Sequence, residues 1–189
     1  MNKIKLKDRY NNDNLVDAKF IALDRNDLNR FMNFQEKIIQ ALDNKDLYAP
    51  ITSTEYIEYL EKPHYILGVE NLNTKELIAV GIYILKKLDK ENYGHDLGFS
   101  EEDLLKTSQI ESTLVSPQFR GNKLQQLICE EFIEKALNQG DKYITATVSP
   151  LNPYSLNSFL ALDFKVEKEK LKYGGLRRYI LSKKLLPDS

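Results

Sequence analysis

Residues 111–128 read ESTLVSPQFRGNKLQQLI, and this stretch decides the fold. A β-rich run stops at Pro117, the chain turns at Gly121, and an amphipathic helix follows. The first N–H groups of a helix have no partner inside it, and the helix dipole adds partial positive charge there. Such a strand–glycine–helix junction suits a phosphate or pyrophosphate. A glycine that merely permits the turn is the alternative, and spacing alone leaves both open.

The segments on either side of this junction alternate between strand and helix patterns. The expected strands are 18–23, 65–70, 77–88, 108–115, 143–148, 164–170 and 178–186. The expected helices are one capped by Asp24 or Asn26 with apolar residues from Leu28 to Leu42, then 53–60, 121–138 and 153–162. Residues 89–107 form the longest irregular stretch, with a short turn at 101–105. This order predicts an α/β protein whose mixed sheet carries helices on both faces.

The composition is that of one globular domain spanning residues 1–189, with 42% apolar and 29% charged residues. A formal charge of −1 provides no general attraction to nucleic acid or anionic lipid. The basic pairs Arg177-Arg178 and Lys183-Lys184 lie in an expected strand and predict a solvated strand face. No apolar run approaches the ~20 residues of a membrane span. We therefore expect a cytoplasmic protein with neither membrane nor nucleic-acid partners.

The cysteine and histidine content argues against metal, disulfide or thiol chemistry. Cys129 is the single cysteine, which excludes an intramolecular disulfide and any CxxC motif. It lies in the apolar part of the expected long helix, so we expect it to pack in the core. His64 and His95 form no HExxH or similar ligand pattern, and no metal site is expected.

Several motifs together resemble one known family. The segment 118–123, QFRGNK, resembles the acyl-CoA signature Gln/Arg-x-x-Gly-x-Gly/Ala of the GNAT superfamily of N-acetyltransferases. The segment 148–155, VSPLNPYS, followed by 162–164, LDF, is similar to the second conserved region of that family. Lys123 and Asp163 depart from it, because each stands where the family prefers or often has a small residue, glycine above all. The resemblance implies a GNAT-like acyl-CoA N-acyltransferase fold with a six- to seven-stranded mixed sheet.

The resemblance implies acetyl-CoA as the cofactor, or co-substrate, held where two neighbouring parallel strands splay apart. Main-chain amides from Arg120 to Leu124 would hold the pyrophosphate. Backbone groups of Leu114 and Val115 would pair with the pantetheine, and an N–H near Val115 would polarise the thioester carbonyl. The implied cofactor-binding residues are Leu114, Val115, Gln118, Arg120, Gly121, Asn122, Lys123, Leu124, Asn152 and Ser155.

Two catalytic candidates follow from the same resemblance. Glu111 stands where many relatives carry a glutamate that removes the amine proton through water. In a regular strand its side chain would share a face with Thr113 and Val115, whereas a bulge would change that register. The alternative is a solvent-facing strand glutamate. Phe159 occupies the position of the tyrosine that protonates the departing thiolate, so Tyr154 is a substitute proton donor or simply a rim tyrosine.

The expected function is acetyl transfer from acetyl-CoA directly to an amine of a small molecule or of a protein or peptide. A non-catalytic acyl-CoA-binding or sensing module on the same fold is the alternative, and a structural domain that binds nothing is a third. The acceptor would lie between residues 43–52 and 89–107, whose acidic content mildly favours a cationic amine. The protein is expected to be a monomer or a homodimer.

Overall fold

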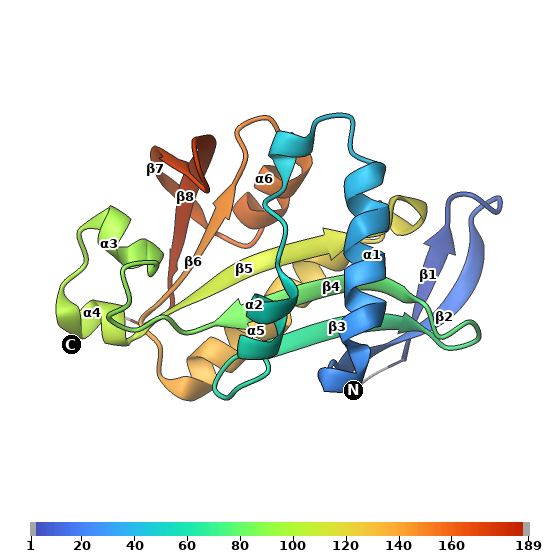
Figure 1. Ribbon diagram of the computed structural model, residues 1–189, viewed down its shortest axis with the longest axis horizontal. Coiled ribbons are helices and arrows are strands. Elements are labelled where there is room, and N and C mark those ends of the chain that lie inside the picture. Colours follow the sequence, from blue (N-terminus) through green and yellow to red (C-terminus); the bar gives the residue numbers. More distant parts are fainter. Residues whose placement is uncertain (1–2, 187–189) are drawn as a thin grey trace.

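The computed structural model describes residues 3–186 and forms one eight-stranded mixed sheet (Figure 1). The strands are β1 Lys3–Asp8, β2 Asn14–Ala22, β3 Tyr65–Asn71, β4 Leu77–Ile84, β5 Thr107–Val115, β6 Tyr143–Val148, β7 Lys165–Lys172 and β8 Leu176–Lys184. Their order in the sheet is β1-β2-β3-β4-β5-β6-β8-β7. β5 and β6 pair parallel, and the other neighbouring strands pair antiparallel. The predicted mixed α/β fold is confirmed, with eight strands instead of six to seven.

The additional strand is β1, which forms an edge hairpin with the lengthened β2. Its sequence KIKLKD alternates lysines with Ile4 and Leu6, and Leu6 is buried. Asn12 and Asp13 adopt positive φ in the connecting turn, a conformation that asparagine and aspartate tolerate. No strand was expected before residue 18, because the lysines of this segment concealed a strand of period two.

The helices are α1 Leu28–Gln40, α2 Ser53–Glu58, α3 Tyr93–Leu97, α4 Glu101–Leu105, α5 Leu124–Gln139 and α6 Pro153–Leu160. α1 and α2 cover one face of the sheet and α5 covers the other (Figure 1). A separate hydrophobic core lies on each face: Phe31 and Tyr56 belong to the first, and Phe132 and Phe159 to the second. Cys129 packs in the second core with 1% exposure, as expected, and burial raises the pKa of its thiol.

Two helix assignments differ from the prediction. The stretch expected to be irregular contains both α3 and α4, each of which begins at a side-chain cap, Asn92 and Ser100 respectively. α5 begins at Leu124 rather than at residue 121, because Gly121 and Lys123 both have positive φ. These two residues form a separate turn before the helix. Within residues 3–186, no helix is both long and apolar enough to cross a bilayer.

The pairing of β5 with β6 stops partway along both strands. It runs from Thr107 opposite Tyr143 to Ile110 opposite Ala146, after which the two strands diverge (Figure 1). β5 also shifts register against β4 between Ile110 and Ser112. Glu111 is therefore the extra residue of a β-bulge. The divergence opens the sheet at the position that the family resemblance implies for a bound cofactor.

Candidate active site

A cavity of about 850 Å³ lies where β5 and β6 diverge. Its walls come from the ends of both strands, the segments leading into α5 and α6, the α1–α2 connection, and the β7–β8 hairpin. The predicted site residues that line it are Glu111, Leu114, Val115, Arg120, Gly121, Lys123, Leu124, Asn152, Tyr154 and Ser155. Residues far apart in the sequence thus meet around one space.

The turn before α5 presents a run of free backbone donors, which we call the amide region. In the part of the chain that the structure describes, the N–H groups of Gly121, Asn122, Lys123 and Leu124 have no hydrogen-bond partner. The N–H of Arg120 differs, because it donates to the Pro117 carbonyl at 3.4 Å. Free amides at the N-terminus of a 16-residue helix suit an anion.

The backbone conformation at Lys123 is one that glycine adopts most easily, although lysine stands there. Lys123 is the N-cap residue of α5 with φ +57°, and its side chain makes no capping hydrogen bond. Asp163, the other departure, has φ +61°. Glycine is favoured at such angles, and a residue with a side chain adopts them at a cost of about 1–2 kcal/mol. Lysine therefore preserves the backbone path through the turn.

Gln118 and Asn122 do not line the cavity, although both lie in the segment that resembles the family signature and were expected to bind the cofactor. The Gln118 side chain donates to Asp8 Oδ2 at 2.8 Å. The Asn122 side chain accepts from the Lys7 N–H at 2.8 Å and donates to the Lys7 carbonyl at 2.9 Å. Both side chains thus attach the turn to β1, the strand that the sequence analysis missed. Their role is to position the turn.

Asn152 and Ser155 stabilise the wall of the cavity that lies opposite the amide region. Asn152 caps α6 by accepting from the Ser155 N–H at 3.1 Å. The Ser155 hydroxyl accepts from Gln125 Nε2 at 2.8 Å, which joins the first turns of α5 and α6. Both residues line the cavity, and their mutual bonds hold the two helix starts together.

The backbone of β5 beyond the bulge also faces the opening. Ser116 donates its N–H to the Ile78 carbonyl on β4 at 2.9 Å. Because backbone groups alternate in direction along an antiparallel strand, Leu114 also faces β4, whereas Thr113 and Val115 face away from it. β6 makes no pair with this part of β5. Thr113 and Val115, not Leu114, therefore present main-chain groups toward the diverging strand.

The bulge turns Glu111 to the opposite face from Val115. Ile110 packs in the core beneath α5, whereas Leu114 packs in the core beneath α1, although an unbroken strand would place both on one face. Glu111 shares the α1 face with Gln109, whose Nε2 donates to Glu111 Oε2 at 2.9 Å. Glu111, Thr113 and Val115 were expected to share a face if the strand is regular. The bulge makes the strand irregular, so Glu111 lies on the other face.

A chain of hydroxyl groups continues from Glu111 into the cavity. Tyr93 OH donates to Glu111 Oε2 at 3.0 Å, and Tyr93 OH and Tyr173 OH lie 2.5 Å apart. Tyr173 OH also lies 3.0 Å from Thr147 Oγ1. Burial and the nearby Glu111 charge raise the pKa of Tyr173 to about 12, so it carries its proton at neutral pH. We call Glu111, Thr147, Tyr173 and Arg178, all of which line the cavity, the tyrosine region.

Burial sets the protonation behaviour of Glu111. Loss of water raises the pKa of its carboxyl group above the ordinary value, and the hydrogen bonds from Gln109 and Tyr93 offset part of that rise. Both of these bonds reach Oε2, and Oε1 has no hydrogen-bond partner among residues 3–186. A carboxylate with one free oxygen and a raised pKa is suited to accept a proton.

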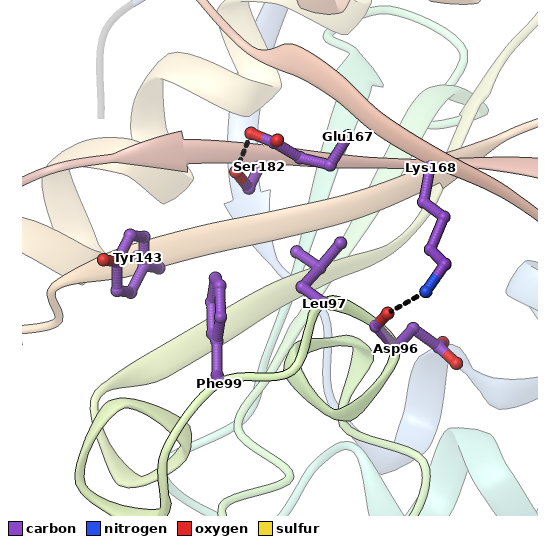
Figure 2. A pocket seen from close by; sticks show the side chains of 7 residues that line it. All are labelled: Asp96, Leu97, Phe99, Tyr143, Glu167, Lys168 and Ser182. Atoms are coloured by element: carbon purple, nitrogen blue, oxygen red, sulfur yellow. Dashed lines mark hydrogen bonds between the residues drawn. The ribbon is translucent and has the colours of Figure 1, made fainter.

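A second pocket, of about 410 Å³, marks where α3 docks on the β7–β8 hairpin (Figure 2). Lys168 Nζ donates to the Asp96 carbonyl at 3.3 Å, and Lys170 and Lys172 each lie 2.5 Å from the Asp96 carboxylate. Burial alone would raise the pKa of Asp96, but the hydrogen bonds from the two lysines lower it overall. These contacts hold α3 on the hairpin and so bring Tyr93 against Tyr173.

The site contains three residues that no sequence pattern predicted: Tyr93, Tyr173 and Arg178. Tyr93 lies in the stretch expected to be irregular, Tyr173 lies between the last two expected strands, and no local spacing relates them. Arg178 was assigned to a solvated strand face, which is wrong, because only 3% of it is exposed. The available signal was Ile180, two residues after Arg178 and so on the same face of the strand, since alternation makes one of two adjacent basic residues face inward.

The remaining candidates occupy the edges of the site. Tyr154 is 86% exposed at the cavity rim, and Phe159 is buried in the wall beneath, against Phe164. His64 accepts from the Leu85 N–H at 3.1 Å, a structural contact that links two segments. His95 lies exposed on α3, and its ring is 3.4 Å from the Leu88 carbonyl.

Comparison with known proteins shows the fold at low sequence identity. No protein-family model matches the sequence, and no curated protein sequence matches it either. A GNAT-family acetyltransferase from Streptococcus pneumoniae is 14% identical with a TM-score of 0.67, and the alignment covers 89% of this chain and 99% of that one. The ribosomal-protein-S18-alanine N-acetyltransferase from Escherichia coli is 13% identical with a TM-score of 0.67, covering 91% and 96%.

A third structure provides a neighbour with a bound ligand. A Salmonella typhimurium protein solved with its cofactor acetyl-CoA is 14% identical with a TM-score of 0.66, and the alignment covers 91% of this chain and 96% of that one. The chain therefore has the fold of the GNAT acetyltransferases.

Proposed function

We propose that this protein is an acetyl-CoA-dependent N-acetyltransferase that transfers the acetyl group directly to an amine of a small molecule or of a protein or peptide. The observation that carries the proposal is one cavity lined both by a turn with free amides and by a buried carboxylate with a free oxygen. The fold and the acetyl-CoA-bound neighbour support it.

The residues of the amide region fit the diphosphate of CoA. Gly121 through Leu124 supply unpaired N–H donors, and Arg120 and Lys123 add positive charge at the cavity wall. A Cβ on Gly121 would meet no atom within 4 Å, so the turn has open space beside this residue. The outward amides of Thr113 and Val115 are the donors available to the pantetheine arm and the thioester carbonyl.

Proton transfer is assigned to the tyrosine region. Acetyl-CoA, when bound, supplies an acetyl group activated as a thioester. Glu111 accepts a proton from the acceptor ammonium group, directly or through water, so that the neutral amine forms its bond to the acetyl carbon. Tyr173 donates a proton toward sulfur as the C–S bond breaks and its electron pair stays on sulfur. Tyr93 connects the two groups, so Tyr173 recovers its proton from Glu111 along hydroxyl groups already in contact. The second proton, which the nitrogen loses as it becomes an amide, then passes to the freed Glu111 carboxylate and on to water.

Tyr154 stays an alternative proton donor at the rim of the cavity. Tyr173 is favoured because it lies in a hydrogen-bonded chain that reaches Glu111, whereas the Tyr154 side chain is almost fully exposed. Either tyrosine would supply the hydroxyl that Phe159 lacks. Cytoplasmic location, a monomeric or homodimeric state and the absence of metal are further parts of the proposal.

The test is single-turnover transfer from labelled acetyl-CoA to a panel of amines, beside thermal unfolding with and without CoA. A ligand at 100 times its Kd adds about 2.7 kcal/mol to the free energy of unfolding. We expect both a CoA-dependent shift and acetylated product. A shift without transfer to any amine would instead support the non-catalytic acyl-CoA-binding module, and no shift would reject both functions.

A further inference from the structure

Arg178 is a buried cation in the wall of the proposed active site. It lies on β8 beyond the last pairing with β6, which ends at Val148 opposite Tyr179. Its exposure is 3%, it lines the cavity, and its guanidinium lies 5.6 Å from the centre of the Tyr173 ring. Arg178 therefore contacts the ring of Tyr173, whose hydroxyl group belongs to the chain that leads to Glu111.

The guanidinium lacks the partners that a buried charge normally has. Nη1 donates to the Arg177 carbonyl at 2.9 Å, whereas Nη2 is buried without any hydrogen-bond partner among residues 3–186. No carboxylate in that range forms an ion pair with Arg178, although the Asp46 charge acts on it from the α1–α2 connection. Burial accordingly lowers the pKa of Arg178. An unpaired buried donor is costly, so its presence in a folded protein calls for an explanation such as a functional role or a bound ion.

Among residues 3–186, the cavity has three other basic residues, and all of them lie at or next to the amide region. Arg120 and Lys123 flank its free N–H groups, and Arg9 lies beside the same turn, where its N–H donates to the Gln118 carbonyl at 3.0 Å. Arg178 comes instead from the same hairpin as Tyr173. A second anion, distinct from the diphosphate, is the group that this cation fits. Arginine presents a planar fork of N–H donors that matches a carboxylate.

We propose that Arg178 binds a carboxylate of the acceptor, so that the substrate is an amine that also carries a carboxylate, such as an amino acid. This inference rests on the proposed transferase function and specifies its substrate class. Glu111 takes the proton of the acceptor amine, and Arg178 holds the opposite charge of the same molecule. The acidic content of the loops favoured a cationic amine, and the buried arginine instead favours a zwitterion.

The experiment compares matched acceptors in wild type and in Arg178→Met. The probes are β-alanine, 4-aminobutyrate and lysine, each beside its carboxamide and beside ethylamine, propylamine or cadaverine, which lack the acid. Wild type is expected to favour at least one acid over its carboxamide by about tenfold to a hundredfold in kcat/KM, the size of a charged hydrogen bond. Arg178→Met is expected to lose that preference and keep the CoA-induced thermal shift.

Arg177→Met is the matched control, because the adjacent arginine is largely exposed and pairs with Glu169. It is expected to keep the preference for acids. Arg178→Lys keeps the charge but not the fork, and it tests the same contact if the methionine variant fails to fold. A structural role would appear as a lowered melting temperature, whereas our assignment expects Arg178→Met to unfold no earlier than wild type.

A binding measurement separates this inference from the transferase function. Calorimetry titrates the three acids into the CoA-saturated and CoA-free protein, in wild type and Arg178→Met. Acid binding that is lost in the variant supports the carboxylate site even if no amine is acetylated. Equal transfer to acids and carboxamides in wild type, or a preference that survives in Arg178→Met, overturns it. Acids that bind neither protein overturn it as well.

Discussion

The amide region and the tyrosine region line one cavity, but they are made of different chemical groups. The amide region consists of main-chain N–H groups from four successive residues, Gly121 to Leu124. The tyrosine region consists of side chains from β5, β6 and the β7–β8 hairpin, completed by Tyr93 from α3. A main-chain site tolerates changes of side chain, as Lys123 illustrates, whereas a side-chain site depends on each residue that forms it. Mutations should therefore affect the two regions by different rules.

The largest expected effect is loss of CoA binding in Gly121→Asp. The new carboxylate would oppose the diphosphate, and φ +89° is a strained angle for any residue with a side chain. We expect calorimetry to detect no CoA binding while circular dichroism reports a folded protein. Gly140→Asp is the matched control, because Gly140 has φ +80° and equally open surroundings at the other end of α5. Unchanged CoA affinity in Gly121→Asp would show that the diphosphate docks elsewhere.

The next effect is on catalysis in Glu111→Gln, with CoA affinity unchanged. Removing a general base typically lowers kcat about 10²–10⁴-fold. Because burial raises the pKa of Glu111, wild-type kcat/KM should fall, as pH decreases, at a higher pH than an ordinary carboxyl value of ~4.3. That acidic limb should be absent from the residual activity of the variant. A limb that persists unchanged would assign the base to another group.

The two candidate proton donors are separated by Tyr173→Phe and Tyr154→Phe. We expect the Tyr173 variant to lose about tenfold to a hundredfold in kcat, because a thiolate with a pKa near ~8.5 leaves tolerably without an acid. Tyr154→Phe should retain wild-type kcat, since its side chain is exposed at the rim. A rapid chemical step in Tyr173→Phe together with a slow one in Tyr154→Phe would reverse the assignment.

The same contrast explains what the sequence could predict. The amide region is contiguous, so one glycine, one proline and one helix pattern were enough to predict the turn, although its role as an anion site stays a prediction. Glu111 was a candidate because the family resemblance implies a glutamate four residues before Val115. Tyr93, Tyr173 and Arg178 lie on segments separated by many residues, and their contacts depend on how α3 docks on the hairpin through Asp96. No local pattern encodes that docking.

Bulges and positive-φ residues set a second limit on prediction. In a regular strand Glu111, Thr113 and Val115 would share one face. One extra residue in β5 instead moves Glu111 to the face opposite Val115. The start of α5 was misplaced for a related reason, because Lys123 gives no sign in the sequence that it will adopt φ +57°. Both features depend on how β5 packs against its neighbours, which a propensity for strand or helix does not describe.

The smallest expected effect is that of Lys123→Gly, which tests the rule for the amide region directly. Glycine should raise the free energy of unfolding by about 1 kcal/mol by removing the left-handed strain. It should also lower CoA affinity by less than tenfold, and only at low salt, because the lysine contributes an exposed charge while the N–H groups remain. Lys75→Gly, with φ +63° in the β3–β4 turn, should give the stability gain without any effect on CoA. A large loss of affinity at high salt in Lys123→Gly would mean that a side chain, not the main chain, holds the diphosphate, and the distinction between the two regions would fail.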